Sequence, residues 1–373
     1  MLTKFDDYPL QQTAEPLAYL ATSDRNAYAR YWFNGFDPDG EFYFGIAFGI
    51  YPHREVMDCA LSIVRKDGTQ DSFRASRRLR GDRTDTRVGP LTLHIEEPMR
   101  TVRVTIDKNN TGITADLTFH ANSPVHLEPS DLLRVGTRPV QKNSRYTQFG
   151  MWAGHITIGE RRQEIDPDRV YGMRDRSWGF RSVGEPEAGL SRPLPDQIFW
   201  LWAPLFWKDR CTHYGLFEDA QGRRSKQFAQ VFPRYPIKSG FDTLSEQGFK
   251  EIVAGNHRLT FQKGSRLVGP SEIDLIEDGK TTVIKLEPLL RFHMMGIGYG
   301  HPTWGHGFYK GEEAITSDHL NLKDIDLNEG QYRHIQQVVR ATSGDQVGYG
   351  VLEQAVIGPH ERYGLTGDHD PTR

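Results

Sequence analysis

One short segment near the middle of the chain combines residue types that can do acid–base chemistry. Residues 171–181 read Tyr-Gly-Met-Arg-Asp-Arg-Ser-Trp-Gly-Phe-Arg, and a single carboxylate, Asp175, lies between Arg174 and Arg176. Aromatic residues interleaved with the charges indicate partial burial, where an aspartate or arginine requires a partner. In an extended strand Asp175 faces one side, whereas Arg174, Arg176 and Trp178 face the other. Asp175 is therefore a candidate catalytic acid, and the structural alternative is a buried salt bridge with its arginine neighbours.

A second region with potential chemistry covers residues 291–311 and is rich in glycine, histidine and aromatic residues. Its glycine spacing resembles a phosphate-binding loop, but Gly-Lys-Ser/Thr is absent, so we expect no nucleotide binding. His301 and His306 fit the roles of acid, base or hydrogen-bond donor to a buried substrate. With His293 they could ligate a metal, but carboxylate or cysteine partners do not follow at a zinc-site spacing, so we expect none. Each histidine alone is also compatible with a structural role.

A further carboxylate and several indoles complete the set of candidate residues. Glu353 lies on a mostly apolar strand, where burial raises the pKa of a carboxyl group, and it is a second candidate acid. Trp200 and Trp202 are two residues apart, so both face one side of a strand. Indoles of this kind occur in cores and around hydrophobic ligands. The candidate substrate-binding residues are Tyr171, Arg174, Arg176, Trp178, Trp200, Trp202, His293, Tyr299 and Trp304.

These side chains need strands to position them, and the composition predicts strands. The 373 residues include 37 glycines and 21 prolines and are 11% aromatic, which favours many short strands joined by turns. Turn residues at 37–40 separate two apolar runs, residues 29–36 and 41–51, which we interpret as a hairpin. The Asp-Gly pair at 67–68 predicts another. We expect an all-β protein without long helices.

Length and charge set the domain organisation and limit the partners. A chain of 373 residues exceeds the usual size of one core, and the Gly- and Pro-rich residues 184–196 predict a linker between domains at 1–185 and 186–373. The net charge of −3 gives no general attraction to nucleic acid or anionic membranes. Two cysteines are too few for a disulfide framework. Without a signal peptide or a long apolar run, we expect a cytoplasmic protein that does not insert into membranes.

Three motifs together resemble those of a known bacterial family. They are Tyr-Gly-x-Arg-Asp-x-Ser-Trp-Gly-x-Arg, Gly-Tyr-Gly-His-Pro-x-Trp-Gly-His-Gly and Leu-Glu-Gln-x-Val-Ile-Gly-Pro. The family is similar to carotenoid 1,2-hydratases, AttH-like proteins and kievitone-hydratase-like proteins of the tandem-calycin superfamily. The resemblance implies two lipocalin-like antiparallel barrels or bent sheets packed in tandem, a ligand pocket at the barrel mouths or the domain interface, and no organic cofactor. It also implies that Asp175 is the proton donor.

We therefore expect a cofactor-independent hydratase or dehydratase, or a cyclase or isomerase, that acts on an apolar, terpenoid-like small molecule. Protonating an alkene requires an acid in a dry site, and aromatic faces stabilise the carbocation that forms. The arginines beside Asp175 favour its ionised form, in which case Glu353 or a histidine would transfer the proton. A non-catalytic carrier of a lipophilic molecule is compatible with the same fold. A glycosidase with two carboxylates is a third hypothesis.

Overall fold

The computed structural model describes residues 1–10, 14–186, 197–237 and 239–367. Within these ranges the regular structure consists of strands and short 3-10 turns, with no α-helix, which confirms the all-β class. The turns are η1 (Lys4–Asp7), η2 (Pro52–Arg54), η3 (Met294–Ile297), η4 (Gly330–Tyr332) and η5 (Glu361–Tyr363). Over the described ranges, no helical element has the length and apolar character needed to cross a membrane.

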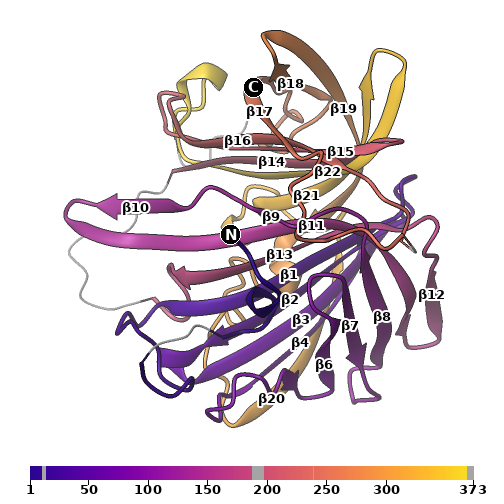
Figure 1. Ribbon diagram of the computed structural model, residues 1–373. Coiled ribbons are helices and arrows are strands. Elements are labelled where there is room, and N and C mark those ends of the chain that lie inside the picture. Colours follow the sequence, from indigo (N-terminus) through magenta and orange to yellow (C-terminus); the bar gives the residue numbers. More distant parts are fainter. Residues whose placement is uncertain (11–13, 187–196, 238, 368–373) are drawn as a thin grey trace.

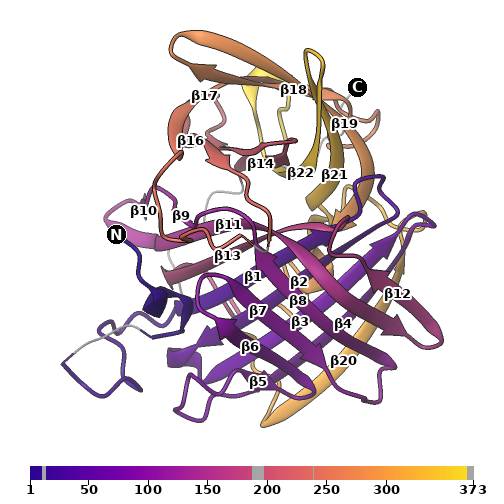
Figure 2. The same ribbon diagram turned by 45° about the vertical axis from the view of Figure 1, so that its right-hand side comes forward.

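The first part of the chain forms one strongly bent antiparallel sheet of 14 strands (Figures 1 and 2). Its central path runs β20-β4-β3-β2-β1-β13-β11-β8-β7-β6-β5, with β9, β10 and β12 added to β11. The strands are β1 (Ala27–Phe36), β2 (Phe42–Tyr51), β3 (Val56–Arg65), β4 (Thr69–Arg78), β5 (Arg87–Val88), β6 (Leu91–Glu97), β7 (Thr101–Ile106), β8 (Ile113–Ala121), β9 (His126–Leu127), β10 (Asp131–Val135), β11 (Arg138–Ile158), β12 (Arg161–Ile165), β13 (Tyr171–Phe180) and β20 (Glu313–Asn321).

The second part closes into an eight-stranded antiparallel barrel, in which β22 pairs with β14 to complete the ring. This barrel and the bent sheet confirm the tandem architecture. The strands are β14 (Ile198–Phe206), β15 (Arg210–Glu218), β16 (Arg224–Pro233), β17 (Lys250–Arg258), β18 (Ser271–Glu277), β19 (Lys280–His293), β21 (His334–Ser343) and β22 (Gln346–Ile357).

The connection between the two parts is not a simple succession along the chain. Strand β20 lies between the barrel strands β19 and β21 in the chain, but it pairs with β4 at the edge of the first sheet (Figure 2). The second half of the chain therefore supplies one strand to the first sheet. Of the predicted linker, residues 187–196 lie outside the described residues. The expected hairpin between residues 29–36 and 41–51 is confirmed as the β1–β2 pair.

Burial patterns along the strands show how the two parts pack. Strands β7 and β8 alternate buried and partly exposed positions, which is the pattern of a sheet with one solvated face. Strands β1 and β2 are buried at every position, because one face packs in the interior of the bent sheet and the other packs against the barrel. Polar residues on the barrel-facing side of β1 are therefore enclosed between the two domains.

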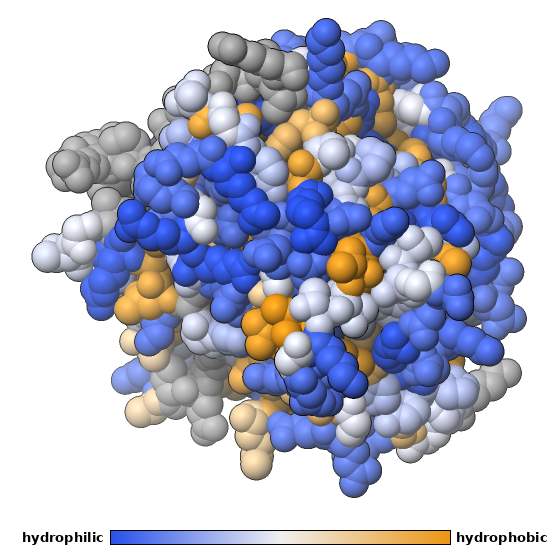
Figure 3. Space-filling model, turned by 90° about the horizontal axis from the view of Figure 1, so that it is seen from above, coloured by the Kyte–Doolittle hydropathy of each residue, from blue (hydrophilic) through white to orange (hydrophobic). Residues whose placement is uncertain are grey.

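The barrel contributes its outer surface to this contact and keeps a separate core inside. Trp200, Trp202 and Phe206 of β14 belong to the interdomain cluster, whereas Phe199 and Leu201 belong to the cluster inside the barrel. The alternation expected for these residues is thus confirmed. Seen from the barrel side, the outer surface is mostly hydrophilic, with hydrophobic residues in small separate spots (Figure 3).

Candidate active site between the two domains

Strand pairing places Asp175 at the centre of the enclosed face. Trp32 of β1 and Thr147 of β11 lie directly opposite Asp175, and two residues along β13 Arg30 and Arg145 lie opposite Ser177 in the same way. Residues opposite each other in an antiparallel sheet project to the same face. Asp175 therefore points toward the barrel with Trp32 and Thr147 beside it.

The other residues of the central motif project to the opposite face. Arg174 donates hydrogen bonds to Asp7 Oδ1 (2.8 Å) and Gln148 Oε1 (2.9 Å) inside the bent sheet. The Arg176 guanidinium lies 4.8 Å from the centre of a Trp178 ring. The buried salt bridge expected as the structural alternative is therefore formed by Arg174 with Asp7, and it does not involve Asp175. Trp178 also lies on the side of the sheet away from Asp175.

The surroundings of Asp175 raise the pKa of its carboxyl group toward neutral pH. Across the described ranges it makes no side-chain hydrogen bond or ion pair, although it is partly accessible to solvent. The backbone of β13 pairs on both sides, so the accessible part is the side chain. Burial raises the pKa of Asp175 to about 7, while the nearby Arg145 acts in the opposite direction.

Trp32, beside Asp175 on the sheet, and Trp202 of β14 have indole N–H groups that are free for a ligand. The rings of Trp32 and Trp202 meet edge to face with centroids 5.5 Å apart. The Nε1 atom of each is buried and has no partner among the described residues, and the same holds for Thr147 Oγ1. Buried indole N–H groups normally have a hydrogen-bond acceptor, so these donors are available to a bound molecule.

Arg145 forms an ion pair with Glu128 and lies within electrostatic range of Asp175 and Glu353. It donates to Glu128 Oε2 (2.8 Å) and lies 5.7 Å from the Trp200 ring centre. Burial alone would raise the pKa of Glu128, but Arg145 lowers it overall. The pKa of Arg145 rises despite its burial, because Glu128, Asp175 and Glu353 all act on it. Its charge thus balances the acidic groups of the site.

Glu353 of β22 is an anchored carboxylate, and the expectation of a raised pKa is wrong. It accepts hydrogen bonds from His334 Nε2 (2.7 Å), Trp200 Nε1 (2.9 Å) and the Gln336 side chain. Burial acts to raise the pKa of Glu353, but these donors lower it overall. Glu353 is therefore ionised at neutral pH, so it suits the role of a base or an orienting group rather than an acid.

The three candidate histidines have separate environments. His301 Nδ1 accepts from the backbone N–H groups of Thr303 and Trp304, so its proton lies on Nε2, which contacts Asp318 at 3.1 Å. His293 Nδ1 lies 3.0 Å from the Tyr332 carbonyl oxygen, and burial lowers its pKa to about 3. The described part of the chain contains no group of three potential metal ligands.

Tyr299 brings the second motif to the domain contact. Its ring meets those of His306 and His334 edge to face, each with centroids 4.6 Å apart. Burial holds the pKa of His306 well below its usual value, so this histidine is neutral. The ring of Tyr171 packs at a tilt against that of Phe206, with centroids 4.8 Å apart, in the apolar part of the contact.

Trp304 lies outside this arrangement. It lines a small cavity of about 20 Å³ with Asp58 and His306, which is sufficient for one water molecule.

Several residues of the interdomain site were not predicted from the sequence. Arg30, Trp32, Arg145 and His334 lie on strands far from the two motifs. The sequence did contain one indication. Arg30 shares a face of a mostly apolar strand with Trp32, and a charged residue that is buried on such a strand often has a functional role. No comparable signal distinguishes Arg145 or His334.

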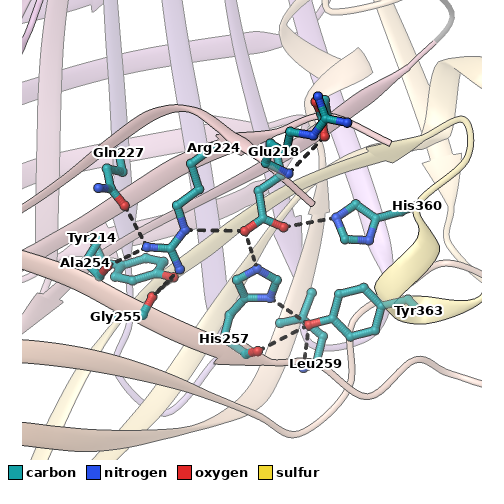
Figure 4. A network of polar contacts seen from close by, with 12 residues as sticks. Tyr214, Glu218, Arg224, Gln227, Ala254, Gly255, His257, Leu259, His360 and Tyr363 are labelled. Carbon is teal, nitrogen blue, oxygen red and sulfur yellow. Dashed lines mark hydrogen bonds and ion pairs between the residues drawn. The ribbon is translucent and has the colours of Figure 1, made fainter. Parts of the chain in front are cut away.

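A second polar network lies inside the barrel and is centred on Glu218 (Figure 4). Glu218 accepts from His257 Nε2 and His360 Nε2, both at 3.0 Å, and His257 Nδ1 lies 2.6 Å from Tyr363 Oη. Burial acts to raise the pKa of Glu218, but the two histidines lower it to about 2. Tyr363 belongs to η5, so this network fixes the C-terminal segment to the barrel.

A family model matches nearly the whole chain. The profile described as "Family of unknown function (DUF8625)" matches residues 2–366. The chain belongs to this family. Comparison of the DUF8625 chain with curated protein sequences gives no match.

Comparison with solved structures finds similar chains. A protein assigned as AttH from Nitrosomonas europaea superposes with a TM-score of 0.53 at 13% identity, covering 93% of this chain and 98% of that one. Kievitone hydratase from Nectria haematococca has a TM-score of 0.43 at 11% identity, with 88% of each chain covered. CghA has a TM-score of 0.47 at 11% identity, with 89% and 88% covered. The similarity to the AttH structure shows that the two chains share a fold.

Proposed function

We propose that the DUF8625 chain is a cofactor-independent hydratase or dehydratase that acts on an apolar small molecule between its two domains. The observation that carries this proposal is Asp175, an enclosed carboxyl group with a pKa of about 7 and no hydrogen-bond partner in the described structure. A catalytic acid works best when its pKa lies near the operating pH. Near neutral pH, Asp175 is protonated in a large fraction of molecules and can donate a proton to an alkene carbon.

The surroundings of Asp175 support the remaining steps. Proton transfer to one alkene carbon leaves a cation on its neighbour, and the faces of Trp32 and Trp202 can stabilise that cation. Water then adds to the cation and loses a proton to a carboxylate. Asp175, ionised by its first transfer, or Glu353 with His334 can accept that proton. Dehydration follows the same steps in reverse, and proton loss without water addition gives an isomer or, after ring closure, a cyclic product.

An untargeted assay tests this proposal without knowledge of the substrate. The purified protein is incubated with an organic extract of a terpenoid-producing bacterium in ¹⁸O-labelled water, and products are followed by mass spectrometry. We expect some compounds to gain one labelled water with the wild type but not with Asp175→Asn. If no compound changes with the wild type but one is retained on the protein, the carrier hypothesis is favoured instead. Equal turnover by both proteins would remove Asp175 from the mechanism.

A matched control separates the loss of the acid from the loss of the fold. Asp345→Asn changes an exposed aspartate in the turn between β21 and β22 and should keep wild-type turnover. Binding of the compound to Asp175→Asn is measured alongside turnover. Retained binding with lost turnover assigns proton transfer to Asp175, whereas an unfolded variant would assign it a structural role.

A further inference from the structure

A group of buried polar side chains lies at one end of the interdomain contact, where β1 meets the loop after η3. Arg30 is 1% exposed, and its Nε, Nη1 and Nη2 atoms have no hydrogen-bond partner within the described ranges. Its guanidinium lies 4.5 Å from the centre of the Tyr299 ring. Tyr28 Oη and His306 Nε2 are buried and have no partner among the described residues, whereas the Tyr51 hydroxyl faces Asp58. Three side chains thus present free donors or acceptors in the same part of the structure.

Electrostatic effects show that these groups face one another. Burial, followed by repulsion from Arg30 and Arg181, keeps the pKa of His306 low. Burial raises the pKa of Tyr51 well above its usual value, and Arg30 and Arg181 both act against that rise. The Arg181 guanidinium lies 4.8 Å from the Tyr28 ring centre. Two guanidinium groups therefore share this enclosed region.

The neighbouring carboxyl group of Asp58 makes no hydrogen bond with Arg30. Asp58 Oδ2 accepts a hydrogen bond from the Gly307 backbone N–H at 2.7 Å. Burial raises the pKa of Asp58 to about 6, although the Gly307 backbone N–H and the nearby Arg30 act to lower it. The guanidinium of Arg30 keeps five N–H donors without a hydrogen-bond partner in the described structure, in a place that excludes most water. A buried charge of this kind is costly unless a partner binds it.

We propose that Arg30, with His306, forms a subsite for the carboxylate group of an otherwise apolar ligand. The planar guanidinium fork matches the two oxygens of a carboxylate, and the neutral histidine can donate a further hydrogen bond. Arg30 and Trp32 are two residues apart on one face of β1. A ligand held at Arg30 therefore extends its apolar part over Trp32 toward Asp175. This inference rests on the proposed function and specifies its substrate class as an organic acid.

Small probe molecules of matched shape test the subsite directly. The unfolding temperature of the wild type is measured with millimolar sodium benzoate and with benzamide, its uncharged counterpart. We expect benzoate, but not benzamide, to raise it. In Arg30→Met the dissociation constant for benzoate should rise about tenfold or more, since the charge-assisted hydrogen bonds are lost. No benzoate-specific shift in the wild type, or a wild-type response in Arg30→Met, would overturn the proposal.

Two further variants control for folding and for position. Arg291→Met removes a partly buried arginine, whose Nη2 already donates to the Leu322 carbonyl oxygen (3.0 Å), and should keep the wild-type response. If Arg30→Met does not fold, Arg30→Lys replaces it. This variant keeps the charge without the fork and should also bind benzoate more weakly. Wild-type benzoate affinity in Arg30→Lys would likewise overturn the assignment of the fork.

The subsite and the proposed function can fail independently. Asp175→Asn should keep the benzoate-specific shift, because Arg30 binds the anion without proton transfer. If turnover is insensitive to Asp175→Asn while the benzoate shift persists, the proposed function is wrong and the anion subsite remains. If turnover depends on Asp175 and benzoate gives no shift, only the subsite is wrong.

Discussion

Replacing Asp175 by asparagine should make the protein more stable at neutral and alkaline pH, although it removes the proposed catalytic acid. The pKa of this carboxyl rises from 3.8 to about 7 in the folded state. A carboxyl with a higher pKa in the folded state stabilises the fold below its unfolded pKa, and this contribution is lost as the pH rises through the folded pKa. Asparagine resembles the protonated acid and cannot ionise.

The size of the effect follows from the same pKa values. The rise is about 3 pKa units at about 1.4 kcal/mol each, so ionisation costs the folded state at most about 4 kcal/mol. Because the side chain is partly accessible, solvent screening reduces the expected value to about 1 to 3 kcal/mol.

Urea unfolding at about pH 5 and about pH 8 measures this difference for both proteins. Other titrating groups are common to both and cancel in the comparison. We expect the stability advantage of Asp175→Asn over the wild type to increase between the two pH values, and Asp345→Asn to show no such increase. A variant that is less stable than the wild type at about pH 8 would refute the reasoning, because it would mean that the ionised carboxylate has a stabilising partner.

Three further substitutions test other parts of the account. Glu353→Gln weakens charge-assisted hydrogen bonds at the barrel surface and should lower the free energy of unfolding by about 1.5 to 3 kcal/mol in urea; an unchanged value would mean that these bonds contribute nothing. The lowered pKa of Glu218 stabilises the fold above pH 4.5, and this contribution is lost as the pH falls through about 2. The free energy of unfolding of Glu218→Gln should therefore fall less between these two pH values than that of the wild type. An identical acid transition in both proteins would contradict this. Gly49→Ala puts a methyl group 2.2 Å from Tyr51 Oη and should cost about 1 to 3 kcal/mol in thermal unfolding, whereas Gly240→Ala meets no atom within 4 Å and serves as its control.

The sequence predicted the strand content and the direction of individual side chains, because both follow from local alternation. Arg174 and Asp175 project to opposite faces of β13 as expected, and Trp200 and Trp202 share the outer face of the barrel. These outcomes require only the two-residue period of a strand. The all-β class follows from the density of aromatic, glycine and proline residues.

The environment of each side chain was harder to predict, because it depends on strands that are distant in sequence. The partner of Arg174 is Asp7, near the N-terminus, and not its neighbour Asp175. Glu353 has a lowered pKa because donors from β14 and β21 converge on it. Arg30 enters the site only through its pairing with β13, more than a hundred residues later. Such contacts are set by sheet order, which local patterns do not contain.

Carbon-13 NMR of aspartate-labelled protein measures directly whether Asp175 titrates near neutral pH in the folded protein. The difference between spectra of the wild type and Asp175→Asn isolates the Asp175 carboxyl resonance. We expect a resonance that changes with a midpoint near pH 7. A midpoint near the ordinary value of 3.8 would contradict this expectation.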